Sequence, residues 1–407
     1  MTIPAELAEL MSARGVRRRA QELLTRAEDG LSDHFIVRRE RLANAVDAVV
    51  DATRRRYPDL VIPYHSRWRH FRLGELDLAD ALFDEARAPH PDEQARQRID
   101  LAVTSVLLDA GAGPGWSYRH SSGARLARSE GLAIASLDAF ATGAFSSDRA
   151  VALRADAAGL EALDERLLAR AFQVTQSNPL VGLSGRAALM RGLGTALRAA
   201  PHLFGADCPR PGNLLDLLRR RHPDGNVPAA SVLEVVLDGF GPIWPGRLRH
   251  GDTPLGDVWR HRAIQRDDAT TGLLPLHKLS QWMTYSLLEP LQGAGLAVTG
   301  LDELTGLAEY RNGGLMLDAG ILATRDATAL DAPIAVDAEL VVEWRALTVA
   351  LLDDIAASVR QHLDLPVSAL PLASVLEGGT WAAGRQFAAE RRDGLPPFEL
   401  ISDGTVF

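Results

Sequence analysis

Hydrophobic residues recur at spacings of three and four along most of the chain, which is the period of an amphipathic α-helix. Stretches that could form strands are few and short, 315–323 and 396–403. The pattern predicts two helices within 4–57 and further helices in 76–111, 123–142, 156–176, 181–200, 214–221, 230–237, 273–291, 339–362 and 373–391. We therefore predict a mainly α fold with at most a few short strands. A single large helical domain fits this pattern, with room for two lobes that meet near the Pro/Gly-rich loop 207–213.

The predicted helix 273–291 is bounded by two prolines, Pro275 and Pro290, which are tolerated at helix ends and not in helix interiors. One face is apolar. Polar side chains and two rings lie on the neighbouring face, namely Lys278, Gln281, Trp282, Tyr285 and Glu289. A helix with this pattern is not a simple surface helix, because the aromatic residues extend its buried side toward Lys278 and Gln281.

A short polar run follows this helix, and it allows two interpretations. Glu309, Tyr310, Arg311 and Asn312 precede a pair of glycines, and an apolar stretch then leads to Asp318. In a small-molecule site, Glu309 would handle a proton or a hydroxyl, Arg311 would hold an anion, and the glycines would let the backbone approach a ligand. In a simple turn, the charges would be solvated and the glycines would cap a helix.

The last predicted helix offers a second possible anion site. If it begins at Gly378, Gly379 and Thr380, its unpaired N–H groups could bind a phosphate, with Trp381 and Arg385 nearby. If the preceding residues are already helical, the glycines instead allow close contact with another helix. The chain ends on the apolar Phe407, so we expect 401–407 to dock and Asp403 to reach the site.

Two aromatic and basic loops, 64–71 and 111–120, also carry possible binding groups. Their rings could stack on a base or simply pack between helices. The second loop begins GAGPG, but no Gly-Lys-Ser/Thr sequence follows, so it does not resemble a nucleotide-binding P-loop.

Composition narrows the classes of function. A formal net charge of -9 argues against a nucleic-acid polymer as partner, although a pocket for a nucleotide can be locally basic. Cys208 is the single cysteine, and HxH and HExxH patterns are absent, so we expect neither a metal site nor another cofactor. A signal peptide and an 18-residue apolar run are also absent. We therefore expect a cytoplasmic protein without a membrane span.

Several stretches resemble the uracil-catabolism protein family of bacteria and fungi, long catalogued as a domain of unknown function. They are HKLSQWMTYSLLEPL, LTGLAEYRNGGLMLDAGIL, VEWRALTVALLD, GGTWAAGRQFAAERR and ISDGTVF. The resemblance implies a role in pyrimidine degradation through a ribosylated uracil with release of urea. A more distant resemblance is to queuosine-phosphate N-glycosidases, which pair a helix bearing Lys and Gln with an acidic-Tyr-Arg triplet. The matching positions are Lys278, Gln281, Glu309, Tyr310 and Arg311, with Glu309 standing where those enzymes usually carry Asp.

The resemblance and the residues together lead to one main hypothesis, a hydrolase that cleaves an N-glycosidic or related C–N bond of a ribosylated uracil derivative. Glu309 and Lys278 would be catalytic. The substrate would be bound by Gln281, Trp282, Tyr285, Tyr310, Arg311, Asp318, Trp381, Arg385 and Asp403. Two alternatives stay open: a metal-dependent amidohydrolase that opens the ring of a uracil nucleotide, and a non-catalytic protein that binds other uracil-degradation enzymes.

Overall fold

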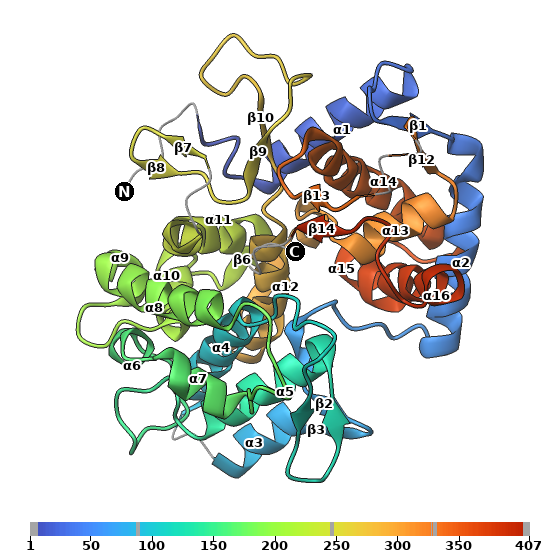
Figure 1. Cartoon of the computed structure of the whole chain (residues 1–407). Coiled ribbons are helices and arrows are strands. Elements are labelled where there is room, and N and C mark those ends of the chain that lie inside the picture. Colours follow the sequence, from blue (N-terminus) through green and yellow to red (C-terminus); the bar gives the residue numbers. More distant parts are fainter. Residues whose placement is uncertain (1–6, 87–89, 245–247, 327, 329–331, 402–407) are drawn as a thin grey trace. The chain divides into compact units, whose positions relative to one another are not determined.

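The structure is a computed structural model that describes residues 7–86, 90–244, 248–326, 328 and 332–401 (Figure 1). It confirms the predicted mainly α fold, because the described strands are only two or three residues long and pair in isolated ladders. The described residues fall into two compact units. The first contains Met1–His65, Arg247–Gln281 and Gly300–Ser402, and the second contains Ser66–Gly246 and Trp282–Thr299.

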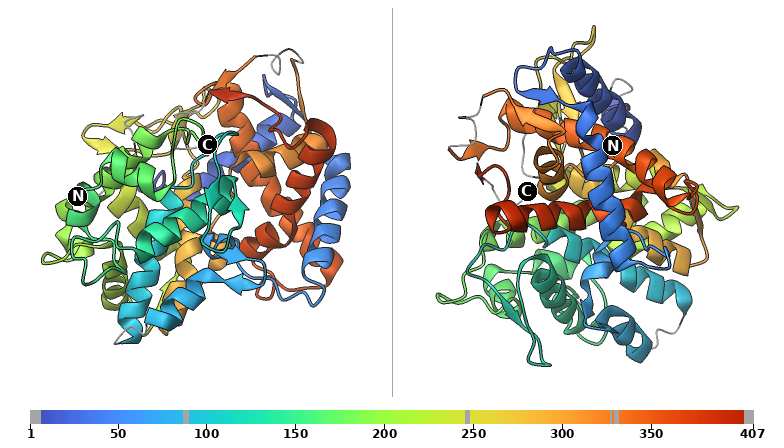
Figure 2. Two further views of the ribbon diagram at one scale, coloured as in Figure 1. Left: turned by 60° about the horizontal axis from the view of Figure 1, so that its bottom comes forward. Right: turned by 90° about the vertical axis from the view of Figure 1, so that its right-hand side faces the viewer.

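The first unit is built around one long helix, α14 (Glu339–Leu363), which packs against α1 and α2. A second close pair is formed by α13 and α16, and α16 also lies beside α2 (Figures 1 and 2). The other helices of this unit are α1 (Ala13–Glu28), α2 (Leu42–Arg56), α13 (Tyr310–Asp318), α15 (Leu372–Val375), the π-helix η8 (Leu376–Thr380) and α16 (Trp381–Arg392). Its ladders are β1 (Phe35–Val37) with β12 (Leu322–Thr324), β7 (Arg249–His250) with β8 (Thr253–Pro254), β9 (Val258–Arg260) with β10 (Leu273–Pro275), and β13 (Ile334–Ala335) with β14 (Leu400–Ile401).

As far as the structure describes it, the second unit is a bundle of shorter helices with three ladders. The helices are α3 (Leu78–Ala86), α4 (Pro91–Leu107), α5 (Arg128–Ala141), α6 (Ala157–Glu161), α7 (Glu165–Ala171), α8 (Leu183–Ala199), α9 (Pro201–Phe204), α10 (Leu214–Arg221) and α11 (Ala229–Phe240). The ladders are β2 (Arg72–Leu73) with β3 (Leu76–Asp77), β4 (Tyr118–Arg119) with β5 (Arg125–Leu126), and β6 (Asn226–Pro228) with β11 (Ala297–Thr299). In helix α12 (Lys278–Gly293), residues 278–281 belong to the first unit and residues 282–293 belong to the second.

The loop 207–213, expected to separate two lobes, lies inside the second unit. Its composition reflects close packing: a Cβ on Gly212 would lie 2.6 Å from the carbonyl oxygen of Arg96, and the Gly212 N–H donates to Asp100 at 2.7 Å. The chain instead passes between the units at 65/66, 246/247, 281/282 and 299/300.

The predicted helix 273–291 starts later than expected and continues past its second proline. Leu273–Pro275 form strand β10, and helix α12 begins only at Lys278. Pro290 lies inside the helix, where it cannot donate to the carbonyl of Ser286. That carbonyl instead accepts a hydrogen bond from the indole of Trp68 at 2.8 Å, which removes part of the penalty for an internal proline.

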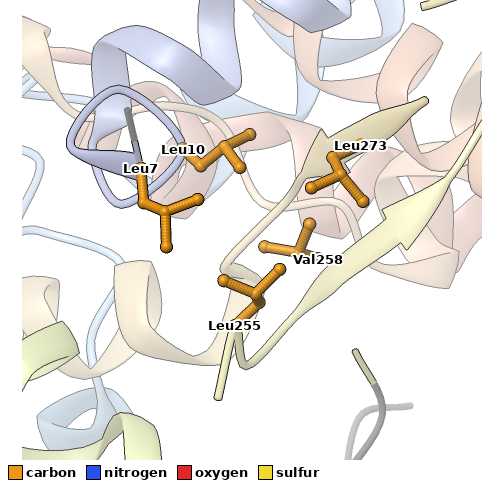
Figure 3. Packing of buried hydrophobic residues seen from close by; sticks show 5 residues of the cluster. All are labelled: Leu7, Leu10, Leu255, Val258 and Leu273. Atoms are coloured by element: carbon orange, nitrogen blue, oxygen red, sulfur yellow. The ribbon is translucent and has the colours of Figure 1, made fainter. Parts of the chain in front are cut away.

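A small hydrophobic cluster holds the β9–β10 ladder against the segment before α1 (Figure 3). It consists of Leu7, Leu10, Leu255, Val258 and Leu273. The carbonyl of Leu10 also accepts a hydrogen bond from the buried ring of His277, at 2.8 Å. Strand β10 ends at Pro275, and His277, with a φ of 44°, turns the chain into α12 at Lys278.

The strand expected in 315–323 is mostly helix, because residues up to Asp318 belong to α13 and only Leu322–Thr324 pair as a strand. The paired glycines are helical and do not adopt positive φ. A Cβ on Gly313 would lie 2.6 Å from the Trp344 indole, so this glycine makes room for a buried ring. In 396–403, Leu400–Ile401 pair with Ile334–Ala335, as far as the described residues reach.

Candidate active site at the start of helices α12 and α13

The carboxylate of Asp257 caps helix α12 from the neighbouring ladder. Its Oδ2 accepts the backbone N–H of Lys278 at 2.8 Å, while its backbone carbonyl accepts the N–H groups of Leu276 and His277. Burial by itself would raise the pKa of Asp257. The Arg345 guanidinium, the Trp259 indole and the Lys278 N–H outweigh burial and lower that pKa to about 2. Asp257 is therefore a permanent anion that fixes the first residue of α12.

Arg345 links this cap to the segment before α13. Its two terminal nitrogens each donate to one oxygen of Asp257 at 2.9 Å, and its Nε donates to the carbonyl of Ala308 at 3.3 Å. Arg345 is 1% exposed, and its guanidinium lies over the Trp259 ring at 5.5 Å. One buried side chain thus connects residue 278 with the residue before Glu309.

Glu309 is the N-cap of α13, so its carboxylate is held by the start of that helix. Oε2 accepts the N–H of Arg311 at 2.7 Å and Oε1 accepts the N–H of Asn312 at 2.6 Å. Burial raises the pKa of Glu309, and these two N–H groups, Lys278 and His65 offset only part of that effect. The Lys278 and His65 side chains therefore lie close enough to act electrostatically on this carboxylate.

Gln281 lies three residues after Lys278, on the same face of α12, and its side chain is fully buried. Its Oε1 accepts the backbone N–H of Thr305 at 3.4 Å, which sets the orientation of the amide. Its Nε2 has no hydrogen-bond partner among the described residues. Such a donor costs about 1–3 kcal/mol, so an acceptor supplied by a ligand would be stabilising.

A second buried carboxylate, Glu377, lies in the π-helix η8, an uncommon helix type that often marks functional sites. It accepts hydrogen bonds from Arg56 at 2.7 Å and Tyr57 at 2.9 Å, and its Oε2 lies 2.9 Å from Nδ1 of His65. Burial would raise the pKa of Glu377, but His65, Arg56 and Tyr57 together lower it to about 2. Glu377 thus orients the imidazole that acts on Glu309.

The helix around Glu377 also decides between the two interpretations of the glycines that follow it. The chain is helical from Leu372 onward, so Gly378 and Gly379 are not at a helix N-terminus. A Cβ on Gly379 would lie 2.3 Å from the carbonyl oxygen of Val49 on α2. The phosphate-binding hypothesis for 378–380 is wrong, and the glycines serve close helix packing.

The other predicted site residues of the first unit are placed as follows. Arg311 is 5% exposed; its guanidinium lies over the Tyr310 ring at 4.8 Å and donates to the carbonyl of Gly394. Asp318 accepts two hydrogen bonds from Arg392, at 2.6 and 2.7 Å. The carboxylate and guanidinium expected to bind substrate thus have contacts within the protein.

Asp318 also lines a cavity of about 390 Å³, together with residues that include Arg41 and Arg391. Lys278, Gln281 and Glu309 do not line this cavity. The position of Asp318 therefore gives no support for a role beside Glu309.

Of the remaining predicted residues, Arg385 is exposed and lies over the Trp381 ring at 5.2 Å. Trp282 and Tyr285 are buried in the second unit, where the Arg67 guanidinium lies 5.7 Å from the Trp282 ring. Asp403 lies outside the described residues.

Asp257, Arg345 and Glu377 were not among the predicted site residues. Asp257 precedes a strand of three residues, Arg345 follows a buried tryptophan, and Glu377 precedes two glycines. Asp257 and Arg345 pair across 88 positions, and Glu377 pairs with Arg56 across 321. The aromatic and basic loop 64–71 did contain one signal, because its His65 is the partner of Glu377.

Comparisons with known proteins identify the family. Residues 9–407 match the model of a family described as protein of unknown function (DUF1688). The chain belongs to this family. It is 36% identical to uracil catabolism protein 4 of Lachancea kluyveri over 444 residues, covering 100% of both chains. It is also 36% identical to protein urg3 of Schizosaccharomyces pombe over 413 residues, covering 98% of this chain and 99% of the relative.

The helices that the structure describes include none that is both long and apolar enough to cross a bilayer. In the same part of the chain, His, Cys, Asp and Glu side chains form no group of three or more that could hold a metal ion.

Proposed function

We propose that this protein acts in uracil degradation and hydrolyses an N-glycosidic or related C–N bond of a ribosylated uracil derivative. The name of the Lachancea kluyveri relative, which matches the chain over its full length, supports the pathway. The observation that supports the reaction is the carboxylate of Glu309, fixed by two backbone N–H groups next to Lys278 and His65.

Breaking a C–N bond at a ribose builds positive charge on the sugar as the nitrogen departs. A carboxylate fixed in advance can stabilise that charge or accept a proton from attacking water without reorganising. Because burial raises the pKa of Glu309, its carboxylate accepts a proton more readily than a solvated one does. Both oxygens are held by N–H groups, so the carboxylate keeps one orientation through the reaction.

The departing uracil or urea gains electron density on its nitrogen and carbonyl oxygens. The Lys278 side chain, which acts electrostatically on Glu309, supplies positive charge for this group. The buried amide of Gln281 adds a donor for a carbonyl oxygen, and its oxygen is already committed to Thr305. Lys278 and Gln281 would therefore bind the leaving group while Glu309 faces the sugar.

The proposal is tested by incubating the purified chain with uridine, uridine 5′-monophosphate and N-ribosylurea with and without a 5′-phosphate. Products are followed by ¹H NMR for free uracil, urea and the sugar. We expect one of these compounds to yield its nitrogen base or urea together with the free sugar in equal amounts. An intact C–N bond in all four would overturn the proposal.

A further inference from the structure

Lys278 is the single lysine in a chain of 407 residues, and the other 43 Lys or Arg residues are all arginine. The two side chains differ chemically. A guanidinium stays protonated in proteins, whereas an ammonium is compact and can lose its proton when it is partly desolvated. In each described ion pair of an Asp or Glu, the cationic partner is an arginine or a histidine, for example in the pairs of Arg17, Arg67 and Arg345. The exception, Lys278, acts electrostatically on the buried carboxylate of Glu309.

The surroundings hold both groups of this pair in place. Asp257 accepts the backbone N–H of Lys278, and Arg345 donates both to Asp257 and to the carbonyl of Ala308. One turn further along α12, the Gln281 side chain accepts the N–H of Thr305. The segments that carry Lys278 and Glu309 are therefore joined at two points, by Arg345 through Asp257 and by Gln281.

The charged groups around the pair are already committed to other partners. The carboxylate of Asp257 forms a two-point ion pair with Arg345. The carboxylate of Glu377 is shared by Arg56, Tyr57 and His65. Those two carboxyl groups keep a pKa of about 2, so they do not exchange protons near neutral pH. Glu309, whose pKa burial raises, is the carboxyl group that can take up and release a proton here.

We propose that Lys278 and Glu309 form a proton-exchanging pair, in which the Lys278 ammonium protonates the departing nitrogen compound and Glu309 deprotonates the attacking water. This inference rests on the proposed function and assigns a role to the primary amine.

The step balances without a further reactant. The C–N bond to the ribose breaks, and a C–O bond forms from water. One water proton goes to Glu309, and one Lys278 proton goes to the leaving group. Glu309 then returns its proton to Lys278, which restores the carboxylate and the ammonium.

The single lysine makes the pairing measurable without substrate. In the full chain labelled with ¹³C- and ¹⁵N-lysine, the side-chain signal has one source, and Lys278→Arg confirms it by removing the signal. We expect the titration midpoint of this signal to move to lower pH in Glu309→Gln, because the variant lacks the anion that favours the ammonium. The matched control, Glu303→Gln at an exposed position before α13, should leave the midpoint unchanged. An unchanged midpoint in Glu309→Gln would overturn the pairing.

The catalytic role is tested with whichever ribosylated compound the wild-type chain cleaves. Lys278→Arg keeps the charge, but a guanidinium does not give up its proton near neutral pH, so we expect kcat to fall by roughly 10²-fold or more with little change in KM. If that compound is uridine or its 5′-monophosphate, the loss should shrink for the 5-fluorouracil analogue, whose leaving group needs less protonation. Added methylamine should partly restore Lys278→Ala. Full activity of Lys278→Arg overturns this inference alone. A wild-type chain that cleaves no probe overturns the proposed function, and the NMR titration still decides the pairing.

Discussion

Arg345 and Asp257 form a two-point ion pair, with both terminal nitrogens of the guanidinium 2.9 Å from the two carboxylate oxygens. The side chain of Arg345 is 1% exposed and that of Asp257 is 11% exposed. Asp257 accepts the backbone N–H of the candidate catalytic residue Lys278, and Arg345 donates to the carbonyl of Ala308, next to Glu309. A planar fork is needed for this arrangement, because a single ammonium cannot contact both carboxylate oxygens and a third acceptor in fixed directions.

Replacing Arg345 by methionine should destabilise the first unit strongly. The change leaves Asp257 buried without its cation, and breaking a buried pair in this way costs about 3–5 kcal/mol. Urea unfolding followed by circular dichroism measures the loss. The matched control is Arg262→Met, since Arg262 is 65% exposed and pairs with Asp33 at the surface. We expect ~0–1 kcal/mol for the control, and equal effects of the two substitutions would contradict a special role for Arg345.

Replacing Glu309 by glutamine should remove turnover and leave the fold intact. We expect kcat to fall by roughly 10²–10⁴-fold, because the amide cannot accept a proton. The amide oxygen can still cap α13, and loss of a cap costs only ~1 kcal/mol. Thermal unfolding and steady-state kinetics are measured on the same preparation, with Glu303→Gln as the control. Wild-type turnover in Glu309→Gln would end the catalytic assignment.

Glu377 should make the protein sensitive to acid. Its pKa is lowered to about 2 in the folded chain, against an ordinary value of 4.5, so the unfolded chain binds this proton first as the pH falls. Its stabilisation is therefore complete above about pH 5 and is lost as the pH falls toward 2. We expect wild type to exceed Glu377→Gln by on the order of 3 kcal/mol at pH 7, and the two to converge near pH 2. A difference in unfolding free energy that stays constant from pH 7 to pH 2 would refute this.

Replacing Gly379 by alanine should destabilise the contact between the π-helix η8 and α2. The new Cβ would lie 2.3 Å from the carbonyl oxygen of Val49, and backbone atoms cannot move aside as a flexible side chain can. Overpacking of this kind costs about 1–3 kcal/mol. Gly185, in α8, has no atom within 4 Å of its Cβ position, so Gly185→Ala should be neutral or slightly stabilising. The melting temperature should therefore fall in Gly379→Ala and stay the same or rise slightly in Gly185→Ala, and an equal fall in both variants would contradict this account.

The spacing of hydrophobic residues was enough to locate helices that carry a regular apolar face along their length, such as α2 and α14. It failed at the start of α12, because the residues that end strand β10 and cap the helix are Val258 and Asp257, about 20 positions earlier. It also misread Gly313, whose lack of a side chain is required by Trp344 on another helix. Propensity describes what a segment can form, and contacts from distant segments decide where it begins and ends.

The sequence by itself determined the mainly α class and the candidates Lys278 and Glu309. It also showed that one of the 44 Lys and Arg residues is a lysine. Each of these is a property of residue type and spacing. The tertiary structure alone decided that Arg345 and Asp257 join the segments carrying those two residues, and that His65 is oriented by Glu377. The physical reason is that a buried charge is tolerated only where partners from other segments surround it, and residues far apart in sequence become partners only when the chain has folded.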